Sequence, residues 1–234
     1  MYRFIRTKLL FISLSLLLFA CAVPQPAVQT GADSEVIDGN LHRVDNAAVT
    51  EAYVDPGFDI DNYEKILIEP LDVSRIALIN PDYSRSDSNW QLNEKDRAYL
   101  AQRYRTSMIK NFFGLGGYTA ALQPGQGVLR IQVALTQVGP SNSPGRTAGS
   151  IIMPARSSTS SGGAIGIVGI VEDSGTGNVV ARFVDVRQCP SNWALSNELG
   201  NREEAKFLFE SWARLFVFRM QENRKKKRET GKVW

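Results

Sequence analysis

The residue types that could catalyse a reaction are sparse in this chain. It has 234 residues and one histidine, His42, so it cannot assemble a histidine metal cluster or give a nucleophilic serine a histidine base. Asp59 and Asp61 are spaced like the first ligands of a calcium loop, but Tyr63 stands where the next ligand belongs. We therefore expect no metal site and no cofactor.

Glycines and paired carboxylates offer two further kinds of chemistry. The glycine-rich stretch 162–169 fits neither a dinucleotide-binding fingerprint nor a P-loop. The pairs Glu172/Asp173 and Glu203/Glu204 could in principle hydrolyse a glycoside. A hairpin turn and the charge preference of a helix N-terminus explain these pairs as well. The sequence thus predicts a protein that is not an enzyme.

The covalent modification that the sequence predicts is on Cys21. Leu18-Phe19-Ala20-Cys21 resembles the lipobox of bacterial lipoproteins, in which a small residue precedes the cysteine that receives a diacylglycerol. Several acyl chains hold a protein firmly, because each buried CH₂ contributes about 0.8 kcal/mol. Ala22, rather than Asp, follows the cysteine, as in cargo of the outer membrane. We expect a lipid anchor at Cys21 and a domain that faces the periplasm.

The residues before Cys21 are typical of a secretory signal peptide, here residues 1–20. Arg3, Arg6 and Lys8 precede an apolar run, and the chain without these three bases has 24 bases and 24 acids. A signal anchor is the alternative, but the low-polarity stretch 9–23 is shorter than the ~20 residues that cross a bilayer. The overall net charge of +3 therefore belongs to the targeting segment.

The second cysteine, Cys189, has no partner in the chain once Cys21 is acylated. A disulfide within the chain is then impossible. Two interpretations of Cys189 remain open, a buried inert thiol and a reactive or intermolecular cysteine.

Hydrophobic periodicity predicts one periplasmic domain over residues 52–222, preceded by a flexible tether over 21–51. Strands are expected at 65–69, 128–138, 164–172 and 179–187, with helices at 93–113 and from 201 onward. The fold class is α+β, in the order strand, helix, three strands, helix. We expect a single small mixed sheet of about four strands, with two long helices on one face.

Local signals support these elements. In the strand at 128–138, Leu129, Ile131, Val133 and Leu135 alternate with more polar residues and predict one core-facing side. Asn93 is expected to cap the first helix, and Gly114 to end it.

A set of short motifs resembles a proteobacterial lipoprotein family, the domain of unknown function 3313. The motifs are Ala52-Tyr53-Val54-Asp55-Pro56, Phe58-Asp59, Tyr63-Glu64-Lys65-Ile66-Leu67-Ile68-Glu69-Pro70, Pro124-Gly125-Gln126-Gly127-Val128-Leu129-Arg130, Ala134-Leu135-Thr136, Asp173, Thr176-Gly177 and Trp212-Ala213. Their order and spacing cover about residues 50–222. The resemblance implies a lipid-anchored periplasmic domain and no activity.

Two apolar features could contact a partner. The first is the tip of the long loop 139–163, with Ile151, Ile152 and Met153, which either docks a partner or lipid surface or folds back onto the domain. The second is Phe207 with Phe218 on the last helix, eleven residues apart and away from its core face. These aromatic residues either pack at the sheet edge or form a partner-binding patch.

The C-terminal tail, residues 223–234, is strongly basic. Arg224, Lys225, Lys226, Lys227 and Arg228 are consecutive, and residues 224–234 have a net charge of +5. Either the tail is a solvated helix end, or it binds anionic headgroups, lipopolysaccharide phosphates or peptidoglycan. Nucleic acid is not expected in this compartment.

Taken together, these features favour an outer-membrane lipoprotein that acts as a non-enzymatic accessory or scaffold and binds an envelope protein or an anionic envelope polymer. The alternative is a carrier of a small ligand or lipid, with an apolar cavity between sheet and helices lined by Leu129, Met108 and Trp212. A hydrolase, with acids clustered in a cleft, is the third possibility.

Overall fold

The structure, a computed structural model, describes residues 24–74, 76–78, 93–140, 162–192 and 200–231. The strands are β1 (Ala27–Val28), β2 (Val36–Ile37), β3 (Leu41–Asp45), β4 (Glu51–Val54), β5 (Lys65–Ile68), β6 (Ala77–Leu78), β7 (Thr119–Ala120), β8 (Val128–Pro140), β9 (Gly162–Asp173) and β10 (Val179–Asn192). The long helices are α2 (Glu94–Ile109) and α3 (Gly200–Thr230).

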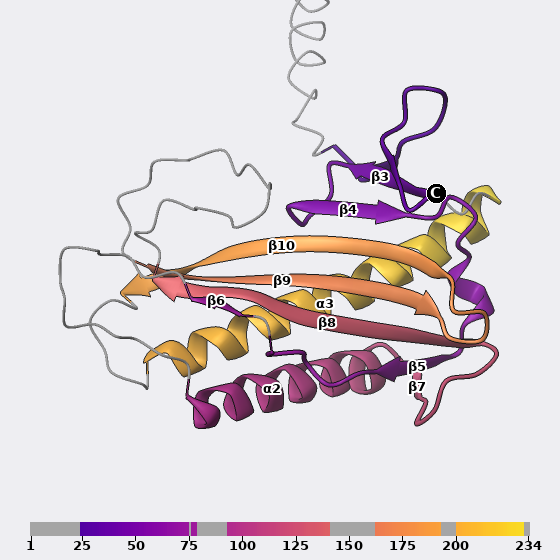
Figure 1. The fold of residues 1–234 in the computed structure, drawn as a ribbon. Helices are drawn as coiled ribbons and strands as arrows, with labels where there is room; N and C mark the ends of the chain where they lie inside the picture. The colour runs from indigo at the N-terminus through magenta and orange to yellow at the C-terminus, as the bar shows by residue number, and fades with distance from the viewer. Residues whose placement is uncertain (1–23, 75, 79–92, 141–161, 193–199, 232–234) are drawn as a thin grey trace, which may run out of the picture.

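All ten strands belong to one mixed sheet, in the order β1-β3-β4-β10-β9-β8-β5-β7, with β2 beside β3 and β6 beside β8. Helices α2 and α3 pack side by side along this sheet (Figure 1). The α+β class is therefore as predicted, but the expectation of a single small sheet of about four strands was wrong.

The centre of the sheet follows the predicted order. Strand β5 is parallel to β8, with Lys65 opposite Val128, whereas β8, β9 and β10 form an antiparallel meander. In β8 the four predicted core residues are all at most 5% exposed. A register shift between Leu135 and Gln137 then turns Val138 into the core as well, since a bulge shifts the alternation by one residue.

The outer strands explain why the sheet is larger than predicted. β4 pairs with β10, with Val54 opposite Ala181, and β3, β2 and β1 continue from β4. Residues 24–51, which the sequence assigns to a flexible tether, thus contribute three strands and the start of a fourth. These strands are two to five residues long and carry no sustained apolar period. They form because β10 would otherwise be the edge of the sheet: β4 pairs with its free backbone groups, and β3 then pairs with β4.

The helices begin where the sequence predicts. Asn93 caps α2, its side-chain oxygen accepting a hydrogen bond from the Asp96 backbone N–H at 2.9 Å. The helix passes Gly114 and continues as the π-helical turn η3 (Lys110–Leu115), and Gly117 then adopts φ +72°. The end is therefore later than expected, because Gly117, rather than Gly114, provides the left-handed conformation that ends helices.

One core lies between the sheet and the two helices. It includes Leu129 from β8, Met108 from α2 and Trp212 from α3, each at most 3% exposed. Tyr104 of α2 meets Phe209 of α3 edge-on, with ring centroids 5.8 Å apart. Within the described ranges, neither helix has an apolar stretch that could span a bilayer.

Candidate binding groove and charged helix end

An apolar groove lies where the outer strands meet the second half of α3. Its volume is about 420 Å³, within the range of roughly 300–1,000 Å³ that is usual for small-ligand sites. We call it the β1–α3 groove. Its apolar wall is formed by Val28, Val44, Val49, Ala52, Phe183 and Phe216.

The aromatic wall of the groove depends on a glycine. Phe183 of β10 and Phe216 of α3 meet edge-on, with ring centroids 4.5 Å apart. The Phe183 ring lies directly over Gly169 of β9, where an added Cβ would be 1.9 Å from the ring. Part of the glycine-rich stretch noted in the sequence therefore serves close packing between strands.

The rim of the groove is charged. Arg182 comes from β10, and α3 contributes Arg219, Glu222, Lys225, Lys226 and Glu229. Arg219 pairs with Glu222 at 2.5 Å, and Arg182 pairs with Asp38 at 2.9 Å. The side chain of Lys225 is 77% exposed and pairs with Glu229 at 3.9 Å. Four bases of the rim face Glu222, Glu229 and Asp38, so the rim carries an excess of one positive charge.

Tyr53 of β4 links the groove to the neighbouring hairpin. Its hydroxyl donates a hydrogen bond to Glu35 at 2.5 Å, and Arg43 pairs with the same carboxylate at 2.6 Å. Burial, followed by the bond to Glu35, raises the pKa of Tyr53 to about 12, so this hydroxyl is a neutral donor at physiological pH. The Tyr53 hydroxyl, with Arg43, lowers the pKa of Glu35.

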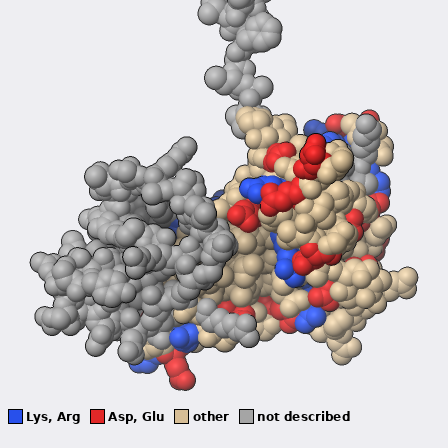
Figure 2. All heavy atoms as spheres, turned by 45° about the horizontal axis from the view of Figure 1, so that its top comes forward, with Lys and Arg blue, Asp and Glu red and all other residues tan. Residues whose placement is uncertain are grey.

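Acidic and basic side chains lie next to one another over the described part of the face in Figure 2.

A buried carboxylate holds together the elements around the groove. Asp185 of β10 is 4% exposed and accepts hydrogen bonds from Trp212 Nε1 at 2.6 Å and from Arg187 Nε at 2.7 Å. It also accepts from the backbone N–H and the hydroxyl of Thr50, at 3.0 and 3.1 Å. Asp185 therefore joins β10 to α3 and to the residue just before β4. Because each of these elements contributes to the groove, this network fixes the shape of the groove.

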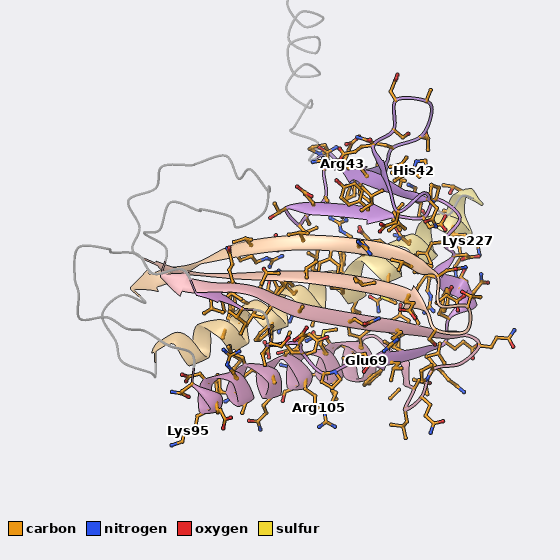
Figure 3. All side chains as sticks on the ribbon, in the orientation of Figure 1. His42, Arg43, Glu69, Lys95, Arg105 and Lys227 are labelled. Carbon is orange, nitrogen blue, oxygen red and sulfur yellow. The ribbon has the colours of Figure 1, made fainter. Side chains whose placement is uncertain are left out.

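Two of the five basic residues that were predicted to form a tail bind the domain itself. Lys227, labelled in Figure 3, comes from the end of α3. It pairs with Asp59 at 2.5 Å and with Asp61 at 3.3 Å, beside the short helix η2 (Ile60–Asn62). The bond to Lys227 lowers the pKa of Asp59, and the same bond raises the pKa of Lys227. The carboxylates whose spacing suggested a calcium loop are thus ion-pair partners.

Arg224, one turn earlier, reinforces this contact. It pairs with Asp61 at 3.3 Å, donates to the Tyr63 carbonyl at 2.9 Å, and its guanidinium lies 4.8 Å from the centre of the Tyr118 ring. The segment predicted as a tail over 223–234 is helical as far as Thr230. Lys225, Lys226 and Arg228 are exposed on this helix end.

The two phenylalanines predicted as a surface feature lie on the outward side of α3. Phe207 is 66% exposed and Phe218 is 51% exposed, whereas Leu208 and Trp212 of the same helix are in the core. The Arg219 guanidinium lies 5.5 Å from the centre of the Phe218 ring.

The other predicted site residues are not positioned. Cys21 and the loop tip of Ile151, Ile152 and Met153 lie outside the described residues. Cys189 lies in β10, but its side chain is not described. Within the described ranges, no three His, Cys, Asp or Glu side chains gather closely enough to hold a metal ion.

Sequence reasoning missed the groove and the Asp185 network. The groove wall comes from β1, β3, β4, β10 and α3, and no local pattern connects these segments. Asp185 stands among alternating residues of a strand, where an acid normally faces water. The spacing of Arg224 and Lys227, three residues apart on one side of a helix, was the available signal for the contact with Asp59 and Asp61.

Comparisons with known proteins point to one family. No curated protein matches the sequence. A PelC dodecamer from Paraburkholderia phytofirmans is 9% identical, with a TM-score of 0.33 over 70% of this chain and 95% of that chain. A minor lipoprotein from Acinetobacter baumannii is also 9% identical, with a TM-score of 0.32 over 69% and 95%. The model of the family described as "Protein of unknown function (DUF3313)" matches residues 40–216, most of the sequence. The chain therefore belongs to the family of proteins with the domain of unknown function 3313, as its motifs predict.

Proposed function

We propose that the protein is an outer-membrane lipoprotein, anchored by an acylated Cys21, whose periplasmic domain binds other envelope components and catalyses no reaction. The observation that carries the binding role is the outward side of α3, with Phe207 and Phe218 exposed on a helix whose other side is fixed in the core. Large aromatic side chains on a rigid element are typical anchors of protein interfaces.

The packing of the core favours this role over that of a carrier with a central cavity. Such a cavity would be lined by Leu129, Met108 and Trp212, and these three residues are packed in the core. Surface docking needs no internal space. Binding of a small ligand or lipid remains the second candidate, supported by the β1–α3 groove at the edge of the sheet.

Crosslinking in intact cells tests the docking role. We expect discrete adducts with envelope proteins for the wild type, and their loss in the double variant Phe207→Ser/Phe218→Ser. Leu122→Ser is the matched control, because Leu122 is 93% exposed on a different part of the domain. Since all three positions are exposed, each substitution should change the free energy of unfolding by only about 0.5 kcal/mol. Undiminished adducts in the double variant would refute docking through α3.

A further inference from the structure

We propose that the β1–α3 groove binds one acyl chain of an anionic phospholipid, taken from the membrane leaflet in which the protein is anchored. The headgroup lies at the basic rim, beside Lys225, Lys226 and Arg182. This inference rests on the proposed function in one respect, the anchoring of the chain through Cys21.

The first support is the distance between the groove and the predicted anchor. Gln25 and Pro26 line the groove, and Gln25 is only four residues after Cys21. An extended chain covers at most about 3.6 Å per residue, so the attachment point lies within about 15 Å of the groove lining. The sequence predicted a flexible tether over residues 21–51, which would separate the domain from the membrane. With β1 beginning at Ala27, the groove instead lies next to the membrane surface.

The second support is the position of the basic residues. The last turns of α3 lie at the same end of the molecule as β3 and β4 (Figure 1). Lys225 and Lys226 therefore lie at the membrane-proximal groove rather than at a distant tail. The four bases of the rim meet Glu222, Glu229 and Asp38, which leaves an excess of one positive charge. The rim is therefore complementary to an anionic headgroup.

The third support is the chemistry of the wall. Valine, alanine and phenylalanine side chains surround the space, with charges gathered at the rim. Val28, Val44 and Val49 are partly buried and pack against the core, so the wall is well supported. A flexible apolar chain with a charged end matches this arrangement, since polar groups in a binding site fix orientation while the apolar wall contributes burial.

Site-specific photocrosslinking of the full-length protein in intact cells tests the proposal. A photoreactive amino acid replaces Ala48, an exposed residue of the groove lining, and in a separate protein it replaces Leu122. After irradiation, the mass of the purified denatured protein identifies the adduct. We expect an anionic phospholipid adduct at position 48 and none at position 122.

The role of the rim is tested by charge reversal. In the background with the crosslinker at position 48, Lys225→Glu/Lys226→Glu should reduce the anionic adduct at least fivefold. Arg228→Glu is the matched control, an exposed base on the same helix end that does not line the groove, and it should leave the yield unchanged. An equal fall in both variants would contradict the assignment of the headgroup site.

Three other results would overturn the proposal. A crosslink from position 48 to the lipid on Cys21 would make the chain's own anchor the occupant. A crosslink to a second copy would make the groove an interface between copies. A lipidated Cys21 without any adduct at position 48 would refute phospholipid binding in the groove and leave the proposed anchoring intact. If Cys21 carries no lipid, the proposed function fails, and the adduct at position 48 still decides whether the groove binds a phospholipid.

Discussion

Removing the Asp185 carboxylate is expected to destabilise the domain strongly. Asp185→Ala deprives Trp212 Nε1–H of its acceptor in a site where Trp212 is 3% exposed. An unsatisfied buried donor costs about 1–3 kcal/mol. Arg187 and Thr50 also lose a partner, but both are partly exposed and can turn toward water. We therefore expect a loss of about 3 kcal/mol, at the lower end of the range of about 3–5 kcal/mol for breaking a buried charged pair.

Urea unfolding followed by far-ultraviolet circular dichroism measures this cost. With a slope of about 2 kcal/mol per molar urea, the midpoint should fall by about 1.5 M. Asp185→Asn keeps the shape of the side chain and one carbonyl acceptor, so its unfolding midpoint should lie between those of the wild type and Asp185→Ala. The matched control is Asp45→Ala, because Asp45 is an exposed acceptor for Gln29, and its effect should be about 0.5 kcal/mol. A loss below about 1 kcal/mol in Asp185→Ala would refute the idea that this network holds β10, α3 and the start of β4 together.

Three further changes test separate parts of the structure. Gly169→Ala forces a methyl group into the Phe183 ring and should cost about 1–3 kcal/mol in urea unfolding, part of which Phe183→Leu in the same chain should restore; an unchanged midpoint would contradict the packing described. Asn93→Ala removes the cap of α2 and should cost about 1 kcal/mol in thermal unfolding, whereas Asn93→Asp should keep most of the stability. The pKa of Asp59 is lowered from its ordinary 3.8 by Lys227, so the stability from this pair is present above pH 3.8 and lost as the pH falls through the lowered value. Lys227→Met should therefore flatten this part of the acid unfolding curve, and an unaltered curve would argue against the contact.

How far the fold could be predicted depends on where each strand lies in the sheet. β5, β8, β9 and β10 carry their own pattern of apolar residues, and they were predicted in the right order along the chain. β1 to β4 are short, and their stability comes from pairing with β10, which follows more than a hundred residues later. Such long-range backbone pairing leaves no local signature, so these residues were taken for a tether.

For the candidate site too, sequence analysis predicted the residues that a local pattern marks and missed those that only the fold brings together. Helical periodicity alone set Phe207 and Phe218 apart from the core side of α3, and the structure places both at the surface. The basic run was visible in the sequence. Only the fold showed that Arg224 and Lys227 bind Asp59 and Asp61. The other three bases of the run, Lys225, Lys226 and Arg228, are exposed. The groove was invisible because its wall combines segments from both ends of the chain.

The intact mass of the full-length protein purified from whole cells tests the central claim most directly. We predict a chain that begins at Cys21 and carries a thioether-linked diacylglycerol and an amide-linked acyl chain, with Cys21→Ser lacking all three acyl groups. A wild-type chain that retains residues 1–20, or that carries an unmodified Cys21, would contradict the lipid anchor and the membrane-proximal position of the groove.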